Sequence, residues 1–426
     1  MTPLYRSRPG GADIHPATVP NAIGINDFIY LSEGLSNSYL VVTDEGRAVI
    51  NTGMGFEAPV HKRAYDAVDT SPIRYILFTQ GHVDHVGGAD LLRQDGTELV
   101  AQSGNQAHQA EDARLMPFRA ARSYFAWAEA IDAAGMAARE RGDEGPPPGQ
   151  ARPVPTITFD DRLELELGGL RFELLATPGG ETVDSMVVWL PQHRICFTGN
   201  LFSALFGHFP NLVTVRGDRY RDALSFVDSL DRVLALEPEI LLVGHHGPVE
   251  GKQLIREELT RLRSAVLYVH DETVKRMNAG EDVFTAMREI EVPTELEVGQ
   301  GYGKIPWSVR AIWENYGGWF HQRSTTELYG VPAASVREDL VTAAGGPDPI
   351  AERARAREEA GEPLEAIHLA EIALAADPDH TVALEASLRA HERLLELSVN
   401  FWETAWLRRE IGFVRERLGA LPPATA

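Results

Sequence analysis

The chain has 426 residues, of which 44% are hydrophobic and 24% charged. This composition is typical of a globular protein, and the length is too great for one ordinary hydrophobic core, so we expect two or three domains. The formal net charge of -22 argues against nucleic acid or an anionic membrane as a general partner. Residues 1–19 are polar and broken by prolines, and no apolar run is long enough to span a membrane. We therefore expect a cytoplasmic protein.

Short strands and one helix are predicted for the first part of the chain. Apolar, β-branched segments predict strands over residues 27–31, 38–42 and 47–51. The sequence T-D-E-G between the last two is typical of a hairpin turn. A helical pattern over residues 60–68 then leads to a further apolar strand over residues 73–78.

The loop after that strand carries the strongest chemical signal in the sequence. Residues 79–88 read T-Q-G-H-V-D-H-V-G-G, which places His82, Asp84 and His85 at the end of a buried strand. Two imidazoles and a carboxylate within four residues are the ingredients of a metal site. The alternative is a polar turn with two surface histidines, but turn chemistry explains only the glycines. We therefore predict that this loop binds a metal ion.

An alanine-rich helical insertion is predicted over residues 107–153, and the glycine- and proline-rich sequence of residues 142–149 ends the helix. It carries the aromatic residues Tyr124, Phe125 and Trp127. Insertions between the strands of an enzyme often form a lid or a substrate wall. The aromatic side chains either line such a wall or pack the helix against the core.

Polar residues also follow the later strands. Glu181 comes after a Gly-Gly turn, Asn200 follows the apolar run that contains the single cysteine Cys196, and His245 and His246 follow another strand. Cys196 is expected to be a buried core residue. The predicted strands cover residues 156–159, 162–167, 170–175, 186–190, 194–197 and 240–243.

The rest of the chain is predicted to be helical. Helical patterns over residues 253–279 and 282–290 form a connector over residues 253–300, and residues 305–320 are dense in aromatic side chains. Residues 349–417 alternate helix and turn in a way that resembles tetratricopeptide-like helical hairpins. We therefore predict an α/β catalytic domain over residues 1–300 and an all-α interaction domain over 301–426.

The loop at residues 79–88 resembles the H-x-H-x-D-H motif of the metallo-β-lactamase superfamily, with Gln80 in the place of the first histidine. The resemblance implies an αββα sandwich, in which the Asp-His pair serves one metal ion and the two earlier histidines serve a second. P-G-G-E, ending at Glu181, is similar to the P-G-T-E turn of the alkylsulfatase group, whose glutamate is a metal ligand.

Two further segments are similar to alkylsulfatases. The sequence N-L-V-T-V-R-G, from Asn211 to Gly217, resembles a segment whose asparagine and arginine lie beside the sulfate, which implies these roles for Asn211 and Arg216. Residues 268–273 and 309–320 resemble that group's later helices and its dimerisation domain. The resemblance therefore implies a homo- or hetero-oligomer formed through the C-terminal helical domain.

Three further positions depart from the family pattern. Asn51 stands where the family has an aspartate, and Gly199 and Asn200 stand where it has a carboxylate that bridges two metal ions. Two dications about 3.5 Å apart repel by roughly 19 kcal/mol at an effective dielectric constant near 20, so the loss of this anion favours one ion over two.

We expect one divalent ion (Zn, Fe or Mn) at Asp84, His85 and His246, with a weaker position near Gln80, His82 and Glu181. His245 and His246 cannot both face one ion from an extended strand, and we choose His246 because it precedes Gly-Pro. The predicted metal ligands are Gln80, His82, Asp84, His85, Glu181, Asn200 and His246, and the predicted catalytic residues are Asp84, Arg216 and Asn211.

The leading functional hypothesis is hydrolysis by a metal-bound water whose pKa is lowered by the cation. The resemblance implies a small hydrophobic substrate with an oxygen-linked alkyl group. It is either an alkyl sulfate ester or an alkyl aryl ether, as in nitroanisole-type O-demethylation, and the missing carboxylates favour the ether. The alternatives are a non-catalytic subunit of a hetero-oligomeric metallohydrolase and a mononuclear iron enzyme of oxygen chemistry.

Overall fold

A computed structural model describes residues 2–143 and 145–420 of the chain, which divide into two compact units, Met1–Tyr316 and Gly317–Ala426. The division falls after helix α8 (Ile305–Gly317), whereas the sequence placed the boundary before it. The reason is packing, because Val309 and Ile312 of α8 are buried in the core of the first unit.

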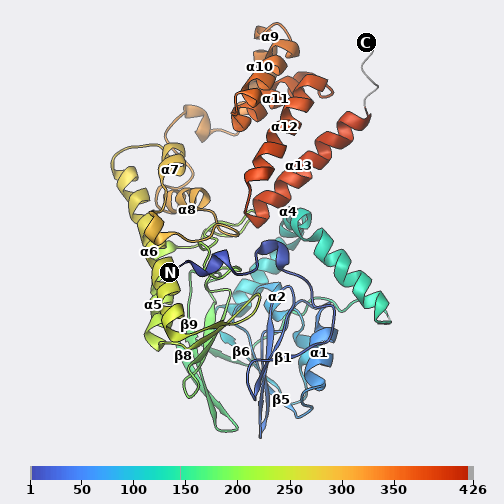
Figure 1. Ribbon diagram of the computed structural model, residues 1–426, viewed down its shortest axis with the longest axis vertical. Helices are drawn as coiled ribbons and strands as arrows, with labels where there is room; N and C mark the ends of the chain where they lie inside the picture. The colour runs from blue at the N-terminus through green and yellow to red at the C-terminus, as the bar shows by residue number, and fades with distance from the viewer. Residues whose placement is uncertain (1, 144, 421–426) are drawn as a thin grey trace. The chain divides into compact units, whose positions relative to one another are not determined.

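Two mixed sheets form the centre of the first unit (Figure 1). The first sheet is antiparallel from β1 to β4 and parallel from β4 to β7, and the second is antiparallel except for the parallel pair β11–β12. In their order across the first sheet, the strands are β1 (Ile23–Gly24), β2 (Ile29–Ser32), β3 (Ser38–Thr43), β4 (Gly46–Ile50), β5 (Ile73–Leu77), β6 (Glu98–Gln102) and β7 (Ile157–Phe159). Across the second sheet they are β13 (Val249–Glu250), β12 (Ile240–Val243), β11 (Ile195–Gly199), β10 (Met186–Leu190), β9 (Leu170–Ala176) and β8 (Arg162–Leu167).

The central strands, such as β4, β10 and β11, are buried on both faces, and alternate side chains enter different layers. In β3, Tyr39 and Val41 pack into the core between the two sheets, while Leu40 packs toward the outer helices of the first sheet. In β10, Val188 points into the central core and Val187 points toward the outer helices of the second sheet.

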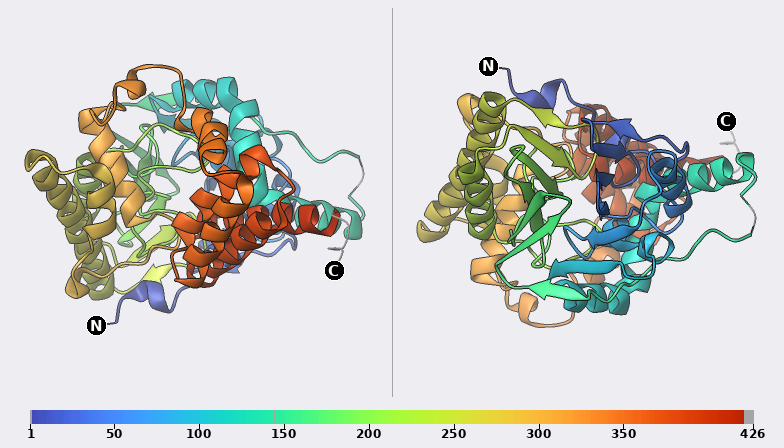
Figure 2. Two further views of the ribbon diagram at one scale, coloured as in Figure 1. Left: turned by 90° about the horizontal axis from the view of Figure 1, so that it is seen from above. Right: turned by 90° about the horizontal axis from the view of Figure 1, so that it is seen from below.

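Helices cover the outer face of each sheet, so the first unit is the predicted αββα sandwich (Figure 2). Helices α1 (Ala58–Asp66) and α3 (Ala89–Leu92) pack on the first sheet, and α5 (Ala223–Leu236) and α6 (Lys252–Asn278) on the second. The short helices α2 (Val83–Val86) and α7 (Val283–Glu289) complete the unit together with α4 and α8.

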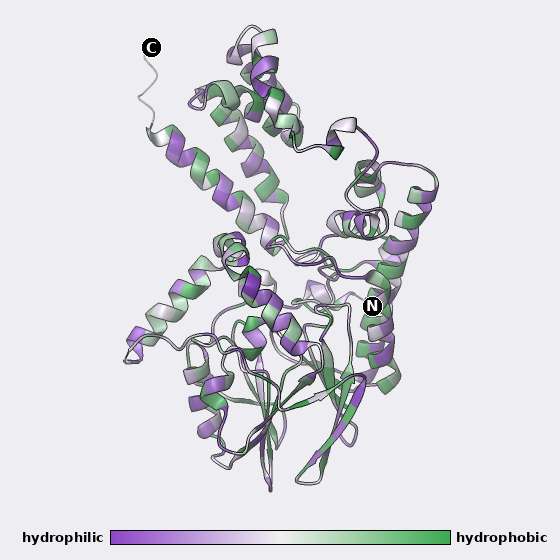
Figure 3. Cartoon of the chain, turned by 180° about the vertical axis from the view of Figure 1, so that it is seen from behind, coloured by the Kyte–Doolittle hydropathy of each residue, from purple (hydrophilic) through white to green (hydrophobic). Residues whose placement is uncertain are grey.

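Helix α4 (Asn105–Glu140) is the predicted helical insertion and runs unbroken for 36 residues. Pro117 lies inside it, so one backbone hydrogen bond of the helix is missing there. Only four of its side chains are fully buried, and hydrophobic and hydrophilic residues alternate along its length (Figure 3). Most side chains of the helix therefore lie outside the hydrophobic core.

The second unit is all-helical. It contains α9 (Arg337–Ala343), α10 (Pro347–Glu359), α11 (Pro363–Ala376), α12 (Thr381–Leu397) and α13 (Phe401–Ala420). Small side chains such as Ala351, Ala370 and Ala383 form its core, which lets the helix backbones approach closely. Pro347 and Pro363 begin two of the helices, where a missing N–H costs nothing. Among the residues that the structure describes, no helix is both long and apolar enough to cross a membrane.

Candidate active site

The loop after β5 is held in place by a neutral side chain. Asn51, at the end of β4, has a left-handed backbone (φ 59°), and its Oδ1 accepts a hydrogen bond from the Thr79 N–H at 2.9 Å. Its Nδ2 lies 3.0 Å from Thr79 Oγ1. Asn51 therefore supports the loop by hydrogen bonds alone and adds no negative charge beneath it.

Asp84 and His85 lie together on the one-turn helix α2. The Asp84 carboxylate is 3.5 Å from His85 Nε2, and His85 is fully buried beside the Ser36 hydroxyl. Burial opposes ionisation of Asp84, but the neighbouring His85 and His82 outweigh it, so the pKa of Asp84 is lowered. Burial also lowers the pKa of His85, so its ring is held neutral and able to offer a lone pair.

His245 lines the cavity that contains Asp84, and His246, the ligand chosen from the sequence, does not. His245 is buried and lines the same cavity as Asp84, and burial lowers its pKa to about 3, with Asp84 and His85 among the charges that act on it. His246 has a left-handed backbone (φ 62°), and the charges that act on it come from Arg8 and other residues of the N-terminal segment. The left-handed backbone at His246 ends the extended course of the chain directly after His245.

We refer to Asp84, His85 and His245 as the Asp84 position, and to Gln80, His82 and Glu181 as the Glu181 position. At the Glu181 position, Arg216 Nη2 donates a hydrogen bond to His82 Nε2 at 3.1 Å. On the other side of the ring, His82 Nδ1 lies 2.9 Å from the amide nitrogen of Gln80 and 3.4 Å from Glu181 Oε1. Both ring nitrogens of His82 are therefore in contact with protein groups.

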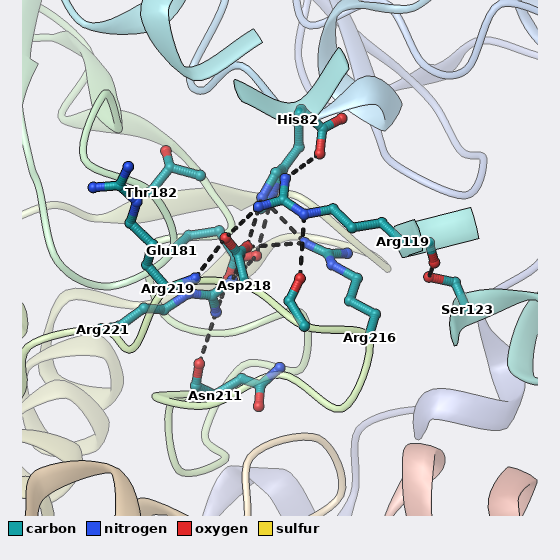
Figure 4. Close-up of polar contacts among 12 residues, drawn as sticks. His82, Arg119, Ser123, Glu181, Thr182, Asn211, Arg216, Asp218, Arg219 and Arg221 are labelled. Atoms are coloured by element: carbon teal, nitrogen blue, oxygen red, sulfur yellow. Dashed lines mark hydrogen bonds and ion pairs between the residues drawn. The ribbon is translucent and has the colours of Figure 1, made fainter. Parts of the chain in front are cut away.

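Glu181 is paired with a residue that the sequence analysis missed. Arg221 donates from Nη1 and Nη2 to the two oxygens of Glu181, each at 3.0 Å, in the two-pronged geometry that guanidinium and carboxylate groups favour (Figure 4). Both side chains are buried. The one signal in the sequence was that Arg221 closely follows Arg216, in a segment that resembles alkylsulfatases. No spacing rule links Glu181 to Arg221.

Arginines and carboxylates alternate around the Glu181 position. Three arginines (Arg119, Arg216 and Arg221) meet three carboxylates (Asp112, Asp218 and Glu181), as Figure 4 shows for most of them. Asp218 lies 3.1 Å from Arg119, 3.7 Å from Arg216 and 3.8 Å from Arg221. Although burial opposes its ionisation, the nearby His82, Arg221 and Arg216 hold the pKa of Asp218 well below its usual range.

The Asp84 position carries the donor types of a divalent metal site, whereas the side chains of the Glu181 position are already engaged by protein groups. At the Asp84 position, one carboxylate and two neutral imidazoles are the donor types of a catalytic zinc site. The buried His245 Nδ1 has no hydrogen-bond partner among the described residues. Among the described residues, no three histidine, cysteine, aspartate or glutamate side chains lie close enough together to hold an ion. At the Glu181 position, a dication about 4 Å from a guanidinium group would be repelled by about 8 kcal/mol at an effective dielectric constant of 20.

Asn200, at the place of the family's bridging anion, is buried and neutral. Its Oδ1 lies so close to Gly244 that a Cβ atom there would approach it to 1.9 Å. Glycine at position 244 is thus required for Asn200 to occupy its place at the edge of the cavity. No negative charge is available at this point to join two metal ions.

A cavity of about 300 Å³ connects these groups to helix α4. One wall is apolar and comes from five side chains of α4, spaced so that they share one face of the helix: Met116, Ala120, Tyr124, Trp127 and Ile131. Polar groups of the opposite wall include His82, Asp84, Arg216 and His245. Asn211, predicted to lie beside a sulfate, does not line this cavity; it is buried, and its backbone carbonyl accepts a hydrogen bond from Arg221 at 2.8 Å.

The chain belongs to the metallo-beta-lactamase superfamily, whose family pattern matches residues 31–245, and the alkyl sulfatase dimerisation family matches residues 286–408. It is 26% identical to a linear primary-alkylsulfatase of a Pseudomonas strain. The match extends over 385 residues and covers 86% of this chain and 72% of that protein. It is 24% identical over 409 residues to an (R)-specific secondary-alkylsulfatase of Pseudomonas sp., covering 89% of this chain and 61% of the relative. Among solved structures, the stereoselective inverting sec-alkylsulfatase Pisa1 from Pseudomonas sp. superposes with a TM-score of 0.79 at 20% identity, over 99% of this chain and 70% of that one.

These comparisons confirm the family and the fold that the sequence resemblance implied. The named relatives are sulfatases, which supports the sulfate ester among the expected substrates and gives no support to ether O-demethylation or to iron-dependent oxygen chemistry. The expectation that the missing carboxylates favour an ether has no support from these relatives. Family membership implies a divalent metal ion, and the identity and number of ions stay predictions.

Proposed function

We propose that this chain is a metal-dependent hydrolase of sulfate esters that carry a small hydrophobic alkyl or aryl group. The observation that supports it best is the cavity in which the apolar face of α4 lies opposite Arg216 and the Asp84 position. An amphiphilic anion has the same two chemistries, a charged head and an apolar tail. The activity of the alkylsulfatase relatives supports the same substrate class.

Each side of the cavity has a distinct part in the proposed reaction. Arg216 keeps about a quarter of its side chain exposed, and its guanidinium is suited to hold the sulfate oxygens by charge-assisted hydrogen bonds. Asp84, His85 and His245 would hold the metal ion, which when bound supplies a water molecule of lowered pKa. Helix α4 excludes bulk water from the apolar tail. Water is consumed, and the ester link is broken to give an alcohol and sulfate.

The test is a sulfate-release assay with medium-chain alkyl sulfates, run beside a nitroanisole-type ether of similar size. We expect metal-dependent release of sulfate and no turnover of the ether. Ether cleavage without sulfate release would contradict the proposal.

A second candidate function is a non-catalytic subunit of a larger metallohydrolase. The observation that favours it is the Glu181 position, where every predicted ligand is engaged by a protein group. Metal analysis of the chelator-free purified protein separates the two functions. Close to one ion per chain supports the enzyme, and no bound metal supports the subunit.

Substrate length should depend on Ala120, the smallest side chain on the α4 wall. Ala120→Trp is expected to fill much of the apolar part of the cavity. It should lower kcat/KM for a long alkyl sulfate by about tenfold or more while a short one loses less, because each excluded methylene forfeits about 0.8 kcal/mol of burial. The control is Ala121→Trp, on the solvent-exposed side of the same helix. Equal losses for both chain lengths would show that α4 does not bind the tail.

The dimerisation family match predicts an oligomer formed by the second unit. At the end of α12 and just beyond it, Leu397 and Val399 expose 75% and 78% of their surface, which is unusual for neighbouring apolar residues. Light scattering should show a dimer for the wild type and a shift toward monomer for Leu397→Glu/Val399→Glu. Val154→Glu, an exposed apolar residue of the first unit, is the control and should stay dimeric. A monomeric wild type over a wide concentration range would exclude the interface.

A further inference from the structure

The Glu181 position is built around protein cations. His82 Nε2 accepts a hydrogen bond from Arg216, and both oxygens of Glu181 accept hydrogen bonds from Arg221. Gln80 replaces an imidazole with an amide that is itself within hydrogen-bond distance of His82. The three side chains that the family pattern assigns to a second metal ion are thus joined to each other and to two guanidinium groups.

Arg221 is not free to leave this arrangement. Its side chain is only 5% exposed, and its Nη1 also donates to the backbone carbonyl of Asn211 at 2.8 Å. Movement of either partner would leave a buried charge unpaired, which is strongly unfavourable. Arg221 therefore places a permanent positive charge against Glu181, and unlike an ion this charge cannot dissociate or be chelated.

We propose that the Arg221 guanidinium, fixed on Glu181, takes the electrostatic place of a second metal ion, so that the chain binds one ion at the Asp84 position only. Arg221 is a positioning residue in this scheme, because it acts through Glu181 and His82 and does not line the cavity. The inference rests on the proposed function in one respect, that the Asp84 position holds an ion.

One consequence distinguishes this inference from a simple loss of one ligand. If Gln80 alone were responsible, Gln80→His would restore the second site. If Arg221 holds the position, Gln80→His still binds one ion, and a second ion requires removal of the guanidinium charge as well. Gln80→His/Arg221→Met removes that charge and frees Glu181, and Arg216 can release His82 to the second ion because Asp218 remains as its partner.

The experiment uses the intact chain, stripped by a chelator and titrated with Mn²⁺ alone. Bound metal is counted by equilibrium dialysis, and electron paramagnetic resonance shows whether two bound ions are close enough for exchange coupling. We expect about one uncoupled ion per chain for the wild type, for Gln80→His and for the charge-conserving Gln80→His/Arg221→Lys. We expect about two coupled ions for Gln80→His/Arg221→Met. The matched control is Gln80→His/Arg219→Met, which removes a nearby arginine whose side chain is 80% exposed and should bind one ion.

Circular dichroism establishes that each variant is folded. If Arg221→Met does not fold, Gln80→His/Arg221→Gln replaces it, because glutamine keeps a hydrogen bond to Glu181 without the charge. Two coupled ions in the wild type, or one ion in the folded charge-free double variant, would overturn the inference. A wild type with one ion and no sulfate-ester activity would overturn the proposed function and leave the inference standing, whereas a wild type that binds no ion would overturn both.

Discussion

His245→Ala is expected to remove bound metal and hydrolase activity together, whereas His246→Ala leaves metal content close to that of the wild type. His245 is buried beside Asp84 and His85, and its imidazole is held neutral by burial. His246 belongs to the environment of the N-terminal segment. Loss of even an outer hydrogen-bond partner of a metal ligand costs about 10- to 100-fold in affinity, so loss of a ligand should cost more than about 100-fold.

Elemental analysis and the sulfate-release assay measure the two effects on the same preparations. Asp84→Asn is the companion variant, since it keeps the shape of the side chain and removes the negative charge that offsets the cation. It should behave like His245→Ala. The reverse result, with metal lost from His246→Ala and retained by His245→Ala, would restore the ligand chosen from the sequence.

Arg216→Ala is expected to lower kcat/KM for alkyl sulfates by about 10- to 100-fold, because a charge-assisted hydrogen bond to an anion contributes about 1.5 to 3 kcal/mol. Arg216 lines the cavity and lies 3.1 Å from His82 Nε2 and 3.7 Å from Asp218, so it is held in place before substrate arrives. Arg216→Lys should recover only part of the activity, since an ammonium group cannot reproduce the planar two-pronged contact.

The control for Arg216 is Arg219→Ala, which removes an exposed arginine paired with Glu111 on the surface. It should leave kcat/KM nearly unchanged. Thermal unfolding of both variants shows whether loss of activity reflects loss of the fold. An Arg216→Ala enzyme with wild-type kcat/KM would place the sulfate elsewhere in the cavity.

Several features of this protein follow from residues that are neighbours in the chain. Asp84 and His85 are adjacent, so the loop motif alone predicts that they lie together, and the structure places them 3.5 Å apart. The strands and helices are also local in origin, because period-two and helical patterns of apolar residues decide which faces are buried. The individual strands and the all-α second unit could be predicted for this reason, whereas the αββα sandwich was implied by the resemblance of the loop motif to a known family.

Other features depend on where the backbone turns and on which distant segments pack together. The left-handed backbone at His246 decides which of two adjacent histidines faces Asp84, and no pattern in the sequence reports a positive φ at a histidine. The packing of Ile312 into the first core moved the boundary between the two units beyond α8. In both cases the outcome depends on contacts that exist only after folding.

The Glu181 position shows this dependence most clearly. From the sequence, Glu181, His82 and Gln80 are a weakened second metal site, since each residue matches or replaces a known ligand. Arg221 is 40 positions away from Glu181 in the chain, and Arg216 is 134 away from His82. The sequence by itself determined which ligand types are present. Only the tertiary structure decided that their lone pairs are already used, because an ion pair between distant segments forms where the packed backbone brings a guanidinium against a buried carboxylate.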